Sequence, residues 1–71
     1  MEKKIFRLIA KIIKVKESQI TKKSCANDFD TWDSLNHVRI ILELEKLKKK
    51  KISTTDSIKL NSIKSIIKFL K

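Results

Sequence analysis

The chain of 71 residues contains no glycine and no proline. Its turns must therefore use asparagine, aspartate, serine and threonine, whose short side chains hydrogen-bond the neighbouring backbone. Alternation of polar and apolar residues does not extend beyond four or five positions, which disfavours long β-architectures, and no internal repeat is visible. Several segments instead carry apolar residues three and four positions apart, which is the spacing of an amphipathic helix. The sequence therefore predicts an all-α fold.

Cysteine and long apolar runs are also scarce. The one cysteine, Cys25, excludes a disulfide framework within the chain and makes a reducing compartment the simpler context. No apolar run approaches the roughly 18 residues that span a membrane. Lys11 and Lys14 interrupt the apolar stretch that an N-terminal signal peptide would need. We therefore expect a cytoplasmic protein with no membrane span.

Histidine is limited to His37, and there is no glycine-rich turn to form an oxyanion hole. A Ser/His/Asp triad therefore lacks its parts. No spacing of histidine and cysteine is typical of a metal site. We expect that the chain is not an enzyme, with no catalytic residues and no metal.

Acidic residues are few, 8 against 18 basic ones, which gives a net charge of +10. Such a charge on a short chain normally indicates nucleic acid or anionic lipid as a partner. The acids are concentrated, however. Residues 28–45 hold five carboxylates against Arg39 alone, a net charge of −4, whereas the other 53 residues hold 17 basic and 3 acidic side chains. These five carboxylates belong to Asp28, Asp30, Asp33, Glu43 and Glu45.

The apolar spacing predicts four helices in one domain spanning residues 1–71, at about 3–15, 34–48, 55–59 and 62–70. In the first, Ile5, Leu8, Ile9, Ile12 and Ile13 form the apolar side. The apolar spacing of a helix is absent from residues 16–32, which are predicted to form a long loop. We expect Ile20 and Phe29 to anchor that loop in the core.

The remaining helices are predicted from their caps and spacing. In the second helix, Leu35, Val38, Leu42 and one of Ile41 or Leu44 are expected to face inward. Residues 53–56 start a short turn that holds Ile58 and Leu60, and Asn61 or Ser62 caps the last helix. The fold class predicted is a small four-helix bundle with a short third helix. The lysine run 48–51 reads as a solvated helix end and turn, where cations suit the helix dipole.

The tetrapeptide Trp32-Asp33-Ser34-Leu35 stands directly before the second helix. It places a hydroxyl beside a carboxylate at a helix start, where unpaired backbone N–H groups favour an attached phosphate. A serine at such a position is usually only an N-cap, and that alternative remains open. Trp32 is expected to pack beside the site. His37 lies one turn beyond Ser34, where it either contacts a phosphate or partner or is an exposed surface residue.

This arrangement resembles the acyl carrier protein family of phosphopantetheine-binding carriers. The resemblance covers nearly the whole chain and begins at Asp33-Ser34-Leu35. It continues through apolar residues and one glutamate at matching positions of the last three helices: Val38, Ile40, Ile41, Leu42, Leu44, Glu45, Ile52, Ile58, Leu60, Ile63, Ile67, Phe69 and Leu70. The fold implied is acyl-carrier-protein-like.

The resemblance implies a covalent cofactor. A phosphopantetheinyl transferase would move 4′-phosphopantetheine from coenzyme A to Ser34, with Asp33 engaging the transferase and its metal. The terminal thiol would then carry acyl or aminoacyl groups as thioesters, in fatty acid or secondary metabolite biosynthesis, to loading and downstream enzymes. The second helix would be the recognition surface of a monomer, through Leu35, His37, Val38, Arg39, Glu43 and Glu45.

Some residues depart from the family pattern. Family members that serve fatty-acid synthesis are strongly acidic, whereas this chain is basic, and Arg39 stands where an acid is usual. Lys48 lies where the family often has a core aromatic residue. The sequence Trp32-Asp33-Ser34-Leu35-Asn36-His37 looks more like carriers of specialised or cell-surface pathways. An apolar space between the second and third helices, lined by residues such as Leu44, Ile52 and Ile58, is expected to shelter a short acyl chain.

The chief alternative is a basic module that binds nucleic acid or an anionic surface. Against specific nucleic-acid binding, the chain shows no helix-turn-helix spacing, and tryptophan and phenylalanine together number four. A second alternative is peripheral membrane binding through the first helix. Packing of the same apolar side into the core explains that helix more simply.

Overall fold

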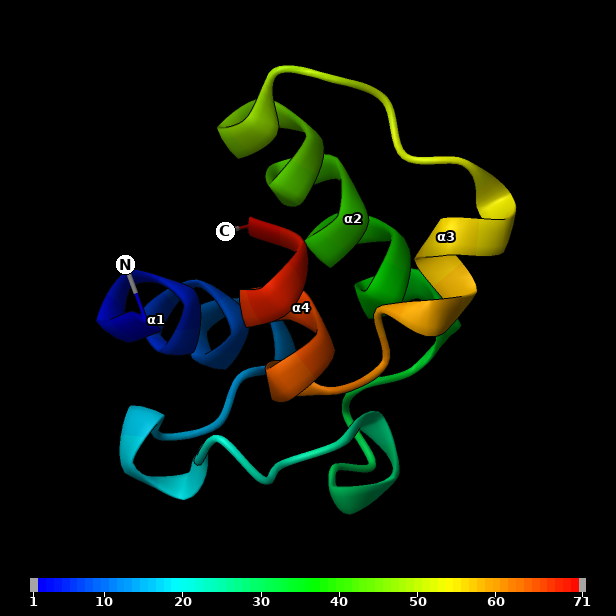
Figure 1. The fold of residues 1–71 in the computed structure, drawn as a ribbon. Coiled ribbons are helices and arrows are strands. Elements are labelled where there is room, and N and C mark those ends of the chain that lie inside the picture. The colour runs from blue at the N-terminus through cyan, green and yellow to red at the C-terminus, as the bar shows by residue number, and fades with distance from the viewer. Residues whose placement is uncertain (1, 71) are drawn as a thin grey trace.

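The computed structural model describes residues 2–70 (Figure 1). Four α-helices account for most of them: α1 (Glu2–Ile13), α2 (Ser34–Lys48), α3 (Thr54–Lys59) and α4 (Ile63–Leu70). Two short 3₁₀ turns, η1 (Glu17–Gln19) and η2 (Ala26–Asp28), lie in the segment between α1 and α2. The prediction of a small all-helical protein with a short third helix is confirmed.

The core lies where α1, α2 and α4 meet (Figure 1). Each of these helices contributes isoleucine or leucine side chains that are fully buried: Ile5, Ile9, Ile13, Ile40, Leu44, Ile63 and Ile66. Burying one such side chain stabilises a fold by about 1.5–3 kcal/mol. The third helix adds no buried residue of its own and is followed by buried Leu60. It is therefore the α-helix held least by the core.

The first helix ends at Ile13, two residues before the predicted end. Lys14 has φ 59°, in the left-handed region, and the Val15 N–H donates to the Ala10 carbonyl oxygen at 3.1 Å. This closure of the last turn is usually made by glycine. A lysine there gives no sequence signal for the end of a helix, which is why the prediction overran it.

The inward face predicted for α2 is wrong at Leu35, Val38 and Leu42, whereas the prediction that Ile41 or Leu44 faces inward is confirmed. Leu35, Val38 and Leu42 are 62%, 54% and 52% exposed. Ile40, Ile41 and Leu44 are the buried residues of the helix. Both sets are spaced three and four residues apart, so the periodicity alone does not decide between them. The positions of α1 and α4 decide which set is buried.

The loop before α2 is anchored as expected. Ile20 is buried and Phe29 packs against the core. Two backbone hydrogen bonds also join the loop to the start of α4: the Ala26 N–H donates to the Asn61 carbonyl oxygen at 2.8 Å, and the Ile63 N–H donates to the Ser24 carbonyl oxygen at 3.0 Å. The segment that leads to Ser34 is thus fixed at several points.

Serine side chains cap the N-termini of α3 and α4. The Ser53 hydroxyl accepts from the Asp56 N–H at 3.1 Å, and the Ser62 hydroxyl accepts from the Ser65 N–H at 3.2 Å. Such caps satisfy backbone donors that have no partner inside the helix. Of the two caps offered by the sequence for α4, Ser62 is therefore the one used.

Candidate functional site

Asp33 begins α2 as its N-cap. Its backbone is extended, and its Oδ1 accepts a hydrogen bond from the Asn36 N–H at 2.9 Å. The Asn36 side chain donates in turn to the Thr31 carbonyl oxygen at 2.7 Å. The first turn of the helix and the residues before it are therefore held in one arrangement.

Ser34 is the first residue within α2 and is exposed. Because Asp33 provides the cap, the alternative that Ser34 is the cap is wrong. Among residues 2–70, no group hydrogen-bonds the Ser34 hydroxyl. The structure thus leaves a free primary alcohol at the positive end of a helix of 15 residues.

Trp32 and His37 form a pair beside this alcohol. Trp32 is buried in the core cluster, as its predicted packing role requires. Its indole N–H donates to His37 Nδ1 at 3.0 Å, and the two rings stack with their centroids 6.3 Å apart. His37 Nε2 lies 2.7 Å from the Ser57 carbonyl oxygen. Since Nδ1 accepts from the indole N–H, Nε2 is the nitrogen that donates to the Ser57 carbonyl oxygen.

His37 therefore connects three parts of the chain: the segment before α2, α2 itself and α3. The sequence alone predicts that His37 either contacts a phosphate or partner or is an exposed surface residue. The half-buried side chain instead uses both nitrogens inside the protein. The contact with Ser57 spans 20 residues, and no short-range pattern in the sequence indicates it.

Two adjoining cavities lie along α2, and Ser34 lines one of them. One of about 440 Å³ opens beside the serine, between the start of α2, η2 and the end of α3. The residues that line it are Ala26, Asn27, Trp32, Asp33, Ser34, His37, Val38, Ile58 and Asn61. A second, of about 220 Å³, lies between α2 and α3 and shares His37 and Val38 with the first. Its other lining residues are Ile41, Leu42, Glu45, Ile52, Thr54 and Ser57.

The predicted lining of the space between α2 and α3 is corrected by these cavities. Ile52 does line it. Leu44 is fully buried in the core instead, because it belongs to the inward face of α2. Ile58 is 67% exposed and lines the cavity beside Ser34. Apolar surface therefore continues from the serine to the cleft between α2 and α3.

The charged residues of α2 that were predicted to recognise partners differ in their contacts. Glu45 Oε2 accepts from the Ile52 N–H at 2.7 Å and holds the segment after α2. Glu43 Oε1 lies 3.7 Å from Lys46 Nζ. Arg39 is exposed, as are Leu35 and Val38. The outward face of α2 therefore presents apolar groups and cations, while its acids are engaged with the chain itself.

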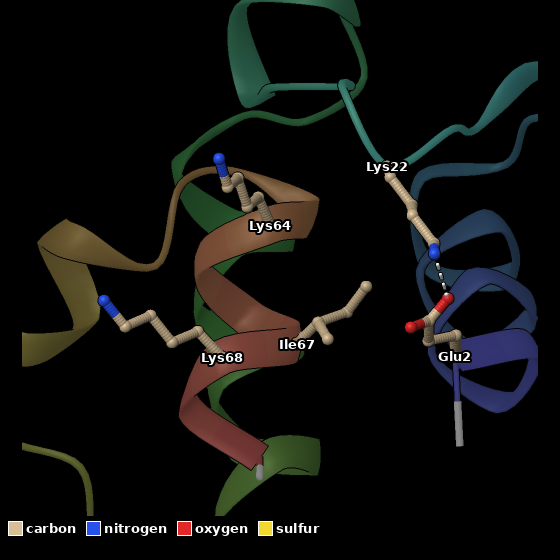
Figure 2. A pocket seen from close by; sticks show the side chains of 5 residues that line it. All are labelled: Glu2, Lys22, Lys64, Ile67 and Lys68. Carbon is tan, nitrogen blue, oxygen red and sulfur yellow. Dashed lines mark ion pairs between the residues drawn. The ribbon is translucent and has the colours of Figure 1, made fainter.

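A further cavity, of about 450 Å³, lies at α1 and α4 and shares no residue with the cavities near Ser34 (Figure 2). Figure 2 shows Ile67 pointing from α4 toward an ion pair in which Lys22 Nζ and Glu2 Oε1 are 3.1 Å apart. Lys64 and Lys68 extend from the same helix. One of its three lysines is thus already paired with a carboxylate.

Comparison of the chain with protein-family models and with curated proteins finds no match to either. Within residues 2–70, no three histidine, cysteine, aspartate or glutamate side chains are placed to hold a metal ion. None of the helices in that range has the length and apolar character needed to cross a bilayer. The geometry around Ser34 is therefore the ground for a functional proposal.

Proposed function

We propose that the chain is an acyl carrier protein that carries acyl or aminoacyl intermediates as thioesters on 4′-phosphopantetheine attached to Ser34. The observation that supports this most is the division of roles at the start of α2. Asp33 caps the helix, and the Ser34 hydroxyl is exposed and unpaired among the described residues. An all-helical fold with a short third helix agrees with the resemblance.

In the proposed attachment, Ser34 Oγ loses its proton and forms a bond to the phosphorus that bears pantetheine in coenzyme A. The bond from that phosphorus to the pyrophosphate bridge oxygen breaks, and adenosine 3′,5′-bisphosphate leaves. The product is a phosphodiester anion at the N-terminus of α2, where the helix dipole and unpaired N–H groups stabilise negative charge. The transferase and its Mg²⁺ supply the catalysis, so the carrier itself is not an enzyme.

Asp33 is proposed to engage the transferase and its metal. One of its oxygens, Oδ1, is used by the Asn36 N–H. Among residues 2–70, the other oxygen, Oδ2, has no hydrogen-bond partner. A carboxylate oxygen is a suitable Mg²⁺ ligand, so Asp33 can cap the helix and contact the metal at once.

The attached arm has apolar surface to follow. The cavity beside Ser34 leads past Val38 to the smaller cavity between α2 and α3, which Ile41 and Ile52 line. We propose that a short acyl chain is sheltered there. Release at a partner enzyme would expose the thioester at high effective concentration, because the arm keeps it attached.

Partner enzymes are proposed to contact the outward face of α2. That face includes three of the residues singled out in the sequence, Leu35, Val38 and Arg39, and the fourth, half-buried Glu43, lies at its edge toward α1 and pairs with Lys46. His37 and Glu45 would act on recognition mainly by fixing the elements around the face, since both are bonded inside the chain. We expect the protein to act as a monomer in the cytoplasm and to bind no specific nucleic acid.

The test is the intact mass of the protein after incubation with coenzyme A, Mg²⁺ and a broad-specificity phosphopantetheinyl transferase. The wild type should gain one phosphopantetheine, and Ser34→Ala should gain none. Thr54→Ala is the matched control. Like Ser34, Thr54 is the exposed first residue of a helix and directly follows the N-cap residue. That variant should be modified like the wild type. An unmodified wild type, or modification that persists in Ser34→Ala, would refute the proposal.

A further inference from the structure

Lysines crowd the C-terminal end of α2 and the residues that follow it. Five of the six residues from 46 to 51 are lysine. Lys46, Lys49, Lys50 and Lys51 border a cavity of about 450 Å³ together with Leu42 and Glu45. Lys48 and Lys50 each place their ammonium 5.9 Å from the centre of the Phe69 ring, which ties this end of α2 to the end of α4. The run 48–51 is the exposed helix end and turn that the sequence predicts, and its lysines are also gathered around a cavity.

The first helix extends the cluster. Lys4, Arg7 and Lys11 border another cavity, of about 330 Å³, with Leu8 of the same helix. Glu43 and Leu47 close this cavity from α2. The surface defined by these two cavities contains seven cations: Lys4, Arg7, Lys11, Lys46, Lys49, Lys50 and Lys51. We call it the basic surface.

The carboxylates near the basic surface neutralise little of its charge. Glu45 bonds the Ile52 N–H, and Glu43 and Glu17 make exposed pairs with Lys46 and Arg7 at 3.7 Å each. Exposed ion pairs of this kind are weak and screened by salt. A strong net positive potential therefore remains, and its natural partner is a surface of many negative charges.

An anionic bilayer and a nucleic acid both carry many negative charges. Exposed apolar side chains on the basic surface favour the bilayer. Leu42 and Leu47, which lie among the lysines, are 52% and 36% exposed. A bilayer can take up such leucines at the level of its headgroups, whereas nucleic-acid phosphates gain nothing from them. Binding of single strands also needs exposed aromatic rings. Within residues 2–70 the aromatic side chains are all buried or partly buried.

We propose that the basic surface binds the anionic headgroups of a lipid bilayer, as a peripheral contact that leaves Ser34 in solution. Lys48 is 14 residues beyond Ser34 on α2, a distance of about 21 Å at the helical rise of 1.5 Å. The acidic residues near Ser34 would be repelled by the same bilayer. Charge therefore orients the protein as well as attaching it, with the candidate site directed away from the lipid.

The experiment measures sedimentation of the whole protein with vesicles of equal parts phosphatidylglycerol and phosphatidylcholine, in about 0.15 M salt. Vesicles of phosphatidylcholine alone provide the neutral reference. The test variant is Lys49→Gln, Lys50→Gln and Lys51→Gln together. The matched control replaces Lys16, Lys23 and Lys59 by glutamine, so both triple variants lose three charges at exposed positions. The segment that holds Lys16 and Lys23 lies away from the end of α2, where the test substitutions are, although its Glu17 pairs with Arg7 (Figure 1).

The wild type should sediment with the anionic vesicles and not with the neutral ones. Each lysine near an anionic leaflet strengthens binding by about five-fold, so the test variant should bind about 100-fold more weakly. The control should lose less than about ten-fold. Absence of wild-type binding, or equal losses in the two variants, would overturn the inference. So would tighter binding of duplex DNA than of vesicles in the same salt. The inference does not depend on Ser34, whose modification is measured separately by mass.

Discussion

At the start of α2, one residue caps the helix and the next one carries the free hydroxyl. The Asp33 carboxylate satisfies the Asn36 N–H, and this leaves the Ser34 hydroxyl without a structural task among the described residues. If serine were the cap, its oxygen would be held by the backbone. The free alcohol is thus a consequence of the residue that precedes it.

The two roles given to Asp33 can be separated by substitution. Asparagine caps a helix about as well as aspartate, whereas alanine costs about 1 kcal/mol. We therefore expect Asp33→Ala to lower the free energy of unfolding by about that amount and Asp33→Asn to leave it nearly unchanged. Both variants should accept phosphopantetheine poorly, because neither has the carboxylate oxygen proposed for the transferase metal. Urea unfolding and intact mass are the two measurements. Normal modification of Asp33→Asn would mean that the carboxylate acts only as a cap.

At the scale of the element, α2 offers two apolar sides and the fold buries one. The buried side carries Ile40, Ile41 and Leu44, and the exposed side carries Leu35, Val38 and Leu42. In a helix with a single apolar stripe the inward face can be read from the sequence. Here the second stripe is left outside, beside the cavities near Ser34, where a partner or an arm can cover it.

The leucines at 42 and 44 give a direct test of this orientation. Leu44→Ala removes a fully buried side chain and should lower the free energy of unfolding by about 2–5 kcal/mol. Leu42→Ala alters a side chain that is 52% exposed and should stay within about 0.5 kcal/mol of the wild type. Chemical denaturation of both variants checks this. A larger loss for Leu42→Ala than for Leu44→Ala would reverse the assigned face.

The elements themselves were largely predictable from local signals. The aspartate before Ser34 indicates the start of α2. The serines at 53 and 62 indicate the starts of α3 and α4 in the same way. The end of α1 was missed because Lys14 gives no helix-stop signal. Contacts between distant segments were missed as well, such as His37 with Ser57, since periodicity carries no information about which helices become neighbours.

At the scale of the whole molecule, charge is distributed unevenly over a small body. The cations of residues 4–11 and 46–51 are far apart in the sequence and meet on one surface only because α1 packs against α2. Along the sequence these cations are divided between the first helix and the lysine run after the second. The fold concentrates them at one surface and leaves the acidic residues 28–33 near Ser34.

This crowding predicts an effect of salt on stability. Like charges on the basic surface repel one another in the folded state, and salt screens that repulsion. Raising sodium chloride from about 0.01 M to about 0.3 M, which shortens the Debye length from about 30 Å to less than 8 Å, should raise the free energy of unfolding by on the order of 1 kcal/mol. The variant with glutamine at 49, 50 and 51 should gain less. A fall in stability with salt would show that ion pairs, not repulsion, dominate.

The buried indole beside Ser34 has an optical consequence. Trp32 is the only tryptophan of the chain, so all indole emission comes from one place. That ring touches the cavity next to the serine and donates to an imidazole whose other nitrogen reaches α3. The fluorescence of Trp32 therefore reports, without any added label, whether α3 is docked and whether the cavity beside Ser34 is occupied.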